Sequence, residues 1–306
     1  MTRFVQVRPM LDTLVKTRQG YRCAVMFLVP TLVSSCAMGV QHSEIIEGAP
    51  IAYVSKADSG PTVVFEAGLG NQLTIWESVY NDVAEFANVM AYSRAGYAGN
   101  LFHIDKGGRR TADDVAGVLR QLLDKRDIPG PYVLVGHSIG GNYALRFAML
   151  YPSDVAGLVL LDSRPKEFSR ECRKAGLRPC GPSEIQAAVQ PAHIAAEIRG
   201  IDETEEQTPI PSELGNLPIT VIAATEPPPG GSRGLQPLWV RLQKQFAERL
   251  ENGRYVQADG SGHFIQRDAP ELVVREIRLL LNRLPHRLIS RARGPSVNTN
   301  LATYLR

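Results

Sequence analysis

Short apolar runs alternate with longer amphipathic segments along most of the sequence, and this alternation limits the folds available to the chain. Each run is bounded by turn residues, which is typical of a buried strand. The runs cover residues 61–67, 87–93, 131–137, 155–162, 217–225 and 253–259. The segments between most of them carry apolar residues at helical spacing. Strands that alternate with helices predict an α/β fold with a mostly parallel central sheet and helices on both faces.

Two of the predicted helices begin with residues that favour a helix start. Thr111 precedes a segment whose first turn contains Asp113 and Asp114. Its hydroxyl is placed to cap the helix, and the two carboxylates are placed to complement the helix dipole. Pro270 is placed to begin the last helix, because its missing N–H needs no acceptor in a first turn.

One interval departs from the alternation. Residues 163–213 contain no strand-like run, and a proline- and charge-rich stretch there precedes a segment of helical composition at 182–200. Inserted between two core strands, the interval predicts a small, mainly helical cap over the C-terminal edge of the sheet. The core is then expected in two parts, residues 41–162 and 214–284, followed by a basic flexible tail at 285–306.

The first 40 residues resemble a targeting segment. Arg18 and Arg22 precede the uncharged run Cys23–Gly39, which is shorter than the roughly 20 apolar residues of a membrane span. The stretch "VSSC", which ends at Cys36, resembles a bacterial lipobox, in which the cysteine carries lipid. We therefore expect an exported protein, either periplasmic or anchored to a membrane through a lipidated Cys36. The alternative is a disordered leader ahead of a mis-annotated start, which would leave the protein cytoplasmic.

The net charge of +3 is concentrated at the two ends of the chain, and the part between them is mildly acidic. That part contains no basic motif with interleaved aromatic residues, so nucleic acid is not an expected partner. No glycine-rich phosphate loop or cluster of metal ligands is recognised, and we expect no cofactor or metal. Cys172 and Cys180 lie eight residues apart in a loop-like stretch, where they form either a small disulfide or two free thiols.

The stretch "VGHSIGG" places Ser138 between a predicted strand and a predicted helix. Gly136 and Gly140 stand two residues before and after the serine, which matches the G-x-S-x-G nucleophile elbow. A strand and a helix nearly touch at such a turn, so the flanking positions favour glycine. This context predicts that Ser138 is a catalytic nucleophile.

A serine hydroxyl needs a base to take its proton. His263 follows the last predicted strand and precedes the last helix. This is where a catalytic histidine is expected in a fold with this nucleophile elbow. His137 is interpreted as a packing residue of the elbow. His103 in a loop and His193 in the cap are interpreted as solvated side chains, and contact with the substrate is the alternative.

The chain resembles the α/β-hydrolase-fold serine hydrolases. The matching stretches are "FEAGLG", "YSRAGYAGN", "GHSIGG", "GLVLLDSRP" and "GSGHFIQRDAPE", within residues 45–284. Relatives often have His-Gly-x in the first of these loops, whereas this chain has Ala67, Gly68 and Leu69. The resemblance implies an oxyanion hole made by the backbone N–H of Ile139 and that of Leu69 or Gly68.

Two carboxylates compete for the role of triad acid. Glu226 follows the strand after which most such hydrolases carry their acid, whereas Asp162 follows the strand before it, a position that some relatives with a cap use instead. Both choices stay open from the sequence. Asp259 and Asp268 flank the histidine and are interpreted as loop caps.

These residues predict a serine hydrolase that cleaves a carboxylic ester or a related acyl bond through an acyl-enzyme. The cap has few large apolar residues, which favours a small or medium-sized soluble ester as substrate. Acyl transfer or cofactorless perhydrolysis on the same triad is the alternative, and a non-catalytic binding module of the same fold is a further one. The oligomeric state is not predicted.

Overall fold

The computed structural model describes residues 38–57, 61–97, 108–227 and 234–285. The predicted leader up to residue 37, including Cys36, and the predicted tail from residue 286 lie outside the described residues, as does His103. Export and lipidation therefore stay predictions. Within the described ranges, no helix combines the length and apolar character needed to cross a membrane.

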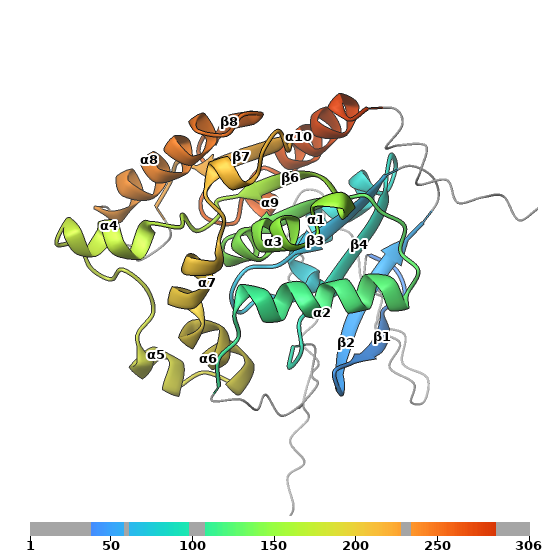
Figure 1. The fold of residues 1–306 in the computed structure, drawn as a ribbon, viewed down its shortest axis with the longest axis horizontal. Coiled ribbons are helices and arrows are strands. Elements are labelled where there is room, and N and C mark those ends of the chain that lie inside the picture. The colour runs from blue at the N-terminus through green and yellow to red at the C-terminus, as the bar shows by residue number, and fades with distance from the viewer. Residues whose placement is uncertain (1–37, 58–60, 98–107, 228–233, 286–306) are drawn as a thin grey trace, which may run out of the picture. The chain divides into compact units, whose positions relative to one another are not determined.

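The centre of the fold is an eight-stranded sheet with the order β1-β2-β4-β3-β5-β6-β7-β8 (Figure 1). The strands are β1 (His42–Ile46), β2 (Ala49–Lys56), β3 (Thr62–Glu66), β4 (Asn88–Ser93), β5 (Tyr132–His137), β6 (Val155–Leu161), β7 (Ile219–Ala224) and β8 (Gly253–Ala258). Strands β3 to β8 run parallel to one another, whereas β2 pairs antiparallel with both β4 and the edge strand β1. The predicted α/β fold with a mostly parallel sheet is therefore confirmed.

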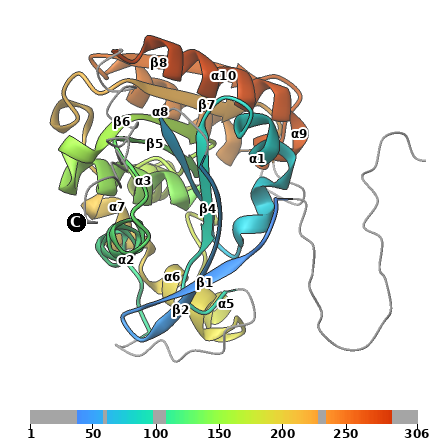
Figure 2. The same ribbon diagram turned by 90° about the vertical axis from the view of Figure 1, so that its right-hand side faces the viewer.

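Helices cover both faces of this sheet. They are α1 (Glu77–Val83), α2 (Ala112–Lys125), α3 (Ile139–Leu150), α4 (Phe168–Lys174), α5 (Glu184–Ala188), α6 (Ala192–Arg199), α7 (Ile201–Gln207), α8 (Leu235–Glu248), α9 (Ile265–Asp268) and α10 (Pro270–Arg283), with 3-10 turns η1 (Leu73–Trp76), η2 (Pro152–Asp154) and η3 (Pro211–Glu213). Apolar side chains of α1 and α10 pack on one face, and those of α2, α3 and α8 pack on the other. Figure 2 shows α1 and α2 on opposite sides of the strands.

The predicted helix starts are present. Thr111 accepts the Asp114 N–H with its side chain, and the Asp114 carboxylate accepts the Thr111 N–H in return, which forms a capping box. Helix α10 begins at Pro270. Both helices are thus positioned by their own first residues as well as by the apolar faces that they bury.

The strand-to-helix turn between β5 and α3 is packed too tightly for larger residues. A Cβ atom on Gly136 would lie 2.6 Å from the Gly140 carbonyl oxygen. A Cβ atom on Gly140 would lie 2.5 Å from the Ala67 carbonyl oxygen and closer still to that of Glu66. These neighbours are backbone atoms that cannot swing aside, so both positions require glycine.

Helices α4 to α7 and the turn η3 lie between β6 and β7 in the chain, within the interval predicted to form a cap. The interpretation of residues 171–180 as loop-like was partly wrong, because Phe168–Lys174 forms α4. Phe168 and Cys172 are buried against Leu238 and Leu242 of α8. This tertiary packing favours the helix in a stretch whose own composition does not.

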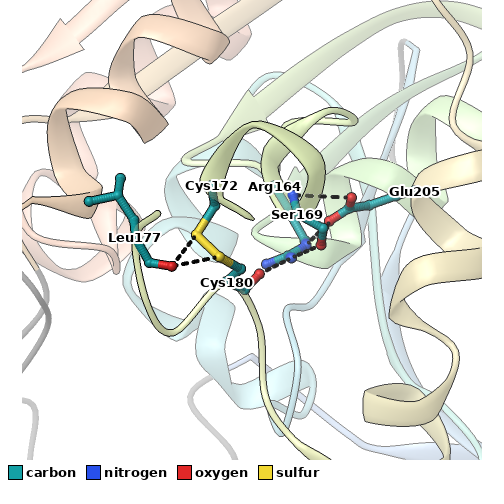
Figure 3. Close-up of a disulfide and its surroundings, with 6 residues drawn as sticks. All are labelled: Arg164, Ser169, Cys172, Leu177, Cys180 and Glu205. Carbon is teal, nitrogen blue, oxygen red and sulfur yellow. Dashed lines mark hydrogen bonds and ion pairs between the residues drawn. A yellow bond between two sulfur atoms is a disulfide. The ribbon is translucent and has the colours of Figure 1, made fainter. Parts of the chain in front are cut away.

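Cys172 and Cys180 form a disulfide with an S–S distance of 2.02 Å, so the pair is not two free thiols in this structure (Figure 3). Arg164 donates to the Cys180 carbonyl and to the Ser169 hydroxyl, and its Nε donates to Glu205 of α7 at 2.5 Å. The disulfide loop is therefore tied both to α4 and, through Arg164, to α7.

We expect the double variant Cys172→Ser/Cys180→Ser to be less stable than the wild type by about 2 to 3 kcal/mol, because the unfolded chain would regain the freedom of the closed loop. The free energy of unfolding of protein prepared without reductant checks this value. Equal midpoints and slopes for the two proteins in urea would contradict it.

The glycine packing predicts opposite effects for two matched helical substitutions. Gly140→Ala should lower the free energy of unfolding by about 2 kcal/mol or more, because its Cβ meets fixed backbone. Gly117→Ala in α2 is the control, since a Cβ there meets no atom within 4 Å. It should raise the stability by up to about 1 kcal/mol through helix propensity. Similar losses in both variants would show that the turn is less tightly packed than described.

Candidate active site

The candidate catalytic residues meet at the carboxyl ends of the parallel strands. Ser138 follows β5, Asp162 follows β6 and His263 follows β8, while Gly68 and Leu69 follow β3. Because neighbouring parallel strands end at the same edge of the sheet, residues far apart in the chain come together there. This edge is where open α/β sheets bind their ligands.

Ser138 lies on a backbone that most residues avoid. Its φ is 55° and its ψ is −126°, and it is half-buried directly before the first turn of α3. A non-glycine residue in such a conformation is strained, and this strain persists only where the surrounding packing imposes it. The backbone carbonyls packed against Gly140 supply that packing, so the turn holds the serine in one orientation.

His263 and Asp162 are hydrogen-bonded. The His263 Nδ1 lies 2.6 Å from Asp162 Oδ2, and because a carboxylate can only accept, Nδ1 carries the proton. In the neutral ring with this tautomer, Nε2 is the nitrogen that can act as a base. Asp162 itself is buried, and its positive φ of 42° sets the direction in which the side chain leaves the end of β6.

The other oxygen of the Asp162 carboxylate is held by three donors. Oδ1 accepts the backbone N–H of Ala224 at 3.1 Å, the indole N–H of Trp239 at 3.1 Å and the side-chain amide of Gln243 at 2.9 Å. Hydrogen bonds to the ionised form stabilise a buried carboxylate. Trp239 and Gln243 were missed by the sequence analysis. Their spacing of four residues places them on one face of α8, but nothing in the sequence shows that this face meets Asp162.

Glu226 does not contact the histidine. Its side chain is exposed and makes no hydrogen bond or ion pair with any other described residue. It lines a shallow hollow together with Gln236 and Gln257. Of the two carboxylates left open by the sequence, only Asp162 is joined to His263.

His137 does more than pack. It is fully buried, and its Nε2–H donates to the backbone carbonyl of His263 at 2.8 Å. The two imidazole rings lie 4.7 Å apart between centroids. Burial, together with the neighbouring His263, lowers the pKa of His137 well below its usual value, so the ring stays neutral. His137 therefore links the turn that carries Ser138 to the loop that carries His263.

The residues of the predicted oxyanion hole lie in the loop beside Ser138 and at the start of α3. A Cβ atom on Gly68 would lie 3.1 Å from the Ser138 Cβ, so this loop runs directly beside the nucleophile. Ile139 is the first residue of α3, and its backbone N–H therefore has no acceptor within the helix. Leu69 is half-buried in the same loop as Gly68.

The Ser138 hydroxyl and the His263 ring, both described, make no hydrogen bond to each other in the structure. Such contacts are often long before substrate binds and shorten in the reacting complex. The Ser138 turn and the His263 loop are nevertheless joined through His137.

Two other sequence interpretations can be compared with the structure. His193, which was expected to be solvated, is half-buried, and its ring meets the Tyr97 ring edge-on at 4.3 Å. Asp268 accepts the Gly262 N–H at 2.9 Å, as a loop cap would. In the part of the chain that the structure describes, no three His, Cys, Asp or Glu side chains are grouped to hold a metal ion.

Comparison with known proteins finds similar sequences and folds. Residues 61–178 match the family described as alpha/beta hydrolase fold. The chain is 26% identical over 251 residues to the uncharacterized protein YqjL of Bacillus subtilis, covering 79% of this chain and 87% of that one. It is 30% identical over 216 residues to the esterase Rv0045c of Mycobacterium tuberculosis, covering 70% of this chain and 61% of that protein.

A solved structure of similar fold is a thermophilic esterase from Thermogutta terrifontis. It superposes with a TM-score of 0.58 at 20% sequence identity, covering 79% of this chain and 98% of that one. At this identity the likeness concerns the fold alone. Taken with the sheet order and the residues at its carboxyl edge, the comparisons show that the chain has the alpha/beta hydrolase fold and support a hydrolase.

Proposed function

We propose that this hydrolase cleaves a carboxylic ester or a related acyl bond through an acyl-enzyme on Ser138. His263 acts as the general base and Asp162 as the acid that orients it. The observation that carries the proposal is the 2.6 Å contact between His263 and a buried Asp162 that is itself held by three further donors. Such an arrangement leaves the imidazole with one basic nitrogen at the edge of the sheet where Ser138 lies.

The chemistry follows from these positions. The Ser138 Oγ attacks the carbonyl carbon of the ester while His263 Nε2 takes the hydroxyl proton. The carbonyl oxygen becomes an oxyanion, which the N–H groups of Ile139 and of Leu69 or Gly68 stabilise. Collapse of this intermediate breaks the bond to the leaving alcohol, which receives its proton from His263. Water then repeats the sequence on the acyl-enzyme and releases the acid.

Asp162 has an electrostatic role in both halves of the reaction. While His263 holds the transferred proton, its ring is a cation, and the carboxylate 2.6 Å away stabilises that charge. The Nδ1 hydrogen bond also selects the tautomer in which Nε2 is the free base. Because Asp162 receives donors from β7 and from α8, it can keep this orientation without support from water.

The molecule that accepts the acyl group from the acyl-enzyme distinguishes hydrolysis from the alternative reactions. An alcohol or a peroxide that replaced water at the acyl-enzyme would give acyl transfer or perhydrolysis on the same residues. One comparison favours water, since the Mycobacterium tuberculosis relative is described as an esterase. A small or medium-sized soluble ester is the substrate class that we propose.

The role of Ser138 is tested by labelling and by hydrolysis. We expect a fluorophosphonate probe to label the wild type and not Ser138→Ala, because only the serine hydroxyl is activated. Hydrolysis of p-nitrophenyl esters should fall by at least about 10³-fold in the variant. A chain-length series from acetate to dodecanoate should show highest kcat/KM at the short and middle lengths. Wild-type protein that neither labels nor hydrolyses any of these esters would refute the proposal.

The role of Asp162 is tested against the competing carboxylate. Asp162→Asn should lower kcat by about 10⁴-fold, because an amide cannot stabilise the imidazolium and favours the wrong tautomer. Glu226→Gln makes the same chemical change at an exposed site and should leave kcat within about threefold, as expected for an exposed polar group outside the chemistry. Steady-state kinetics on one ester measures both. A larger loss in Glu226→Gln than in Asp162→Asn would reverse the assignment.

A further inference from the structure

Arg94 is a buried cation that has no role in the proposed reaction steps. It is the first residue after β4 and is only 4% exposed. Its guanidinium makes five hydrogen bonds through its three nitrogens, to backbone carbonyls of one loop and to carboxylates of two different elements. A buried arginine is favourable only when its donors are satisfied in this way.

Two of these bonds hold the loop that supplies the oxyanion donors. Nη1 donates to the Ala67 carbonyl at 2.6 Å, and Nη2 donates to the Gly68 carbonyl at 2.9 Å. In a trans peptide the carbonyl and the N–H of the next residue point in opposite directions within one plane. Fixing the carbonyls of Ala67 and Gly68 therefore fixes the directions of the N–H groups of Gly68 and Leu69.

Two of the other three bonds reach a helix of the segment between β6 and β7, and the third reaches Glu66 at the end of β3. Arg94 Nε and Nη2 form a bidentate pair with Glu197 of α6, at 2.7 and 2.9 Å. Glu197 is fully buried, and Arg110 donates to it as well at 3.0 Å. The Tyr97 hydroxyl donates to Glu197 at 2.8 Å and accepts the Gly70 N–H at 3.1 Å. Helix α6 and the loop 67–70 are thus joined through Arg94 and again through Tyr97.

Glu197 is the more fully charged partner of Arg94. Glu66 also pairs with Arg94, at 2.7 Å, but burial raises the pKa of Glu66 to about 7 in spite of the arginine. Burial alone would raise the pKa of Glu197 too, yet Arg94, Arg110 and their hydrogen bonds outweigh it and hold that pKa below its usual value. Near neutral pH the arginine therefore depends chiefly on a carboxylate from α6.

We infer that Arg94 is a positioning residue that orients the Gly68 and Leu69 N–H groups of the oxyanion hole. Through Glu197, it also couples this orientation to the position of α6. The inference rests on the proposed function, because it concerns how the transition state of that reaction is stabilised. The forked geometry of the guanidinium is needed, since it contacts two carbonyls and two carboxylates at once. An ammonium group keeps the charge but cannot reach all four.

Arg94→Lys tests the inference with the charge retained. We expect kcat for a p-nitrophenyl ester to fall by about 10- to 100-fold with KM within about threefold, because the donors act on the transition state more than on the bound ester. The affinity for a trifluoromethyl ketone, which forms a tetrahedral oxyanion on the serine, should fall by a similar factor. Amide hydrogen exchange should become faster in peptides covering residues 67–70 and 192–199.

Glu197→Gln and Arg146→Lys complete the experiment. Glu197→Gln leaves Arg94 in place and should produce a smaller loss of kcat, by about 3- to 10-fold, with faster exchange at residues 192–199 and 67–70 together. Arg146→Lys is the matched control, because Arg146 pairs with Asp113 at 2.6 Å and makes no contact with the loop 67–70. It should leave kcat and ketone affinity unchanged.

The outcomes separate this inference from the proposed function. A wild type that is inactive toward esters and unlabelled at Ser138 refutes the proposed function. An active wild type whose Arg94→Lys variant keeps kcat, ketone affinity and exchange at residues 67–70 refutes the positioning role alone. An equal loss of kcat in Arg146→Lys also refutes it, because the effect would then be one of general stability.

Discussion

The carboxylate of Asp162 is the point at which the separate parts of this site are joined. It follows β6, receives the backbone N–H of Ala224 at the end of β7, and is bound by Trp239 and Gln243 of α8 as well as by His263 from the loop after β8. A buried carboxylate with four donors has little freedom to turn. The orientation of the histidine is consequently set by the sheet and α8, and only secondarily by its own loop.

The same packing explains which parts of the fold the sequence could predict. Strands β3 to β7 are buried runs bounded by turns, so their existence and their parallel arrangement follow from composition and alternation, whereas β8 at the edge of the sheet is largely exposed. Strand β1 is mostly exposed and has no apolar alternation, and neither it nor β2 was predicted. Helix α4 was missed for a related reason, since its stability comes from α8, a partner far along the chain.

The residues of the site were predictable where each lies at a fixed position in the fold, directly after a predicted strand. Ser138 and His263 occupy strand ends that the alternation alone identifies. Asp162 and Glu226 occupy equivalent ends of adjacent strands, so no pattern in the sequence could separate them. The difference lies in three dimensions: the positive φ of Asp162 and the donors of α8 direct one carboxylate to the histidine, while the other faces solvent.

The two halves of the proposed active site are held by different elements, and this has a consequence for how the site can vary. The histidine and its acid are held by α8 and the sheet, whereas the oxyanion loop is held by Arg94 and, through Glu197, by α6. A change in the position of α6 would therefore alter the direction of the oxyanion donors without changing the position of His263. Substrates that displace α6 would be bound but turned over slowly, because the stabilisation lost is specific to the transition state. In the proposed reaction, the segment between β6 and β7 would thus act on kcat as well as on the fit of the substrate.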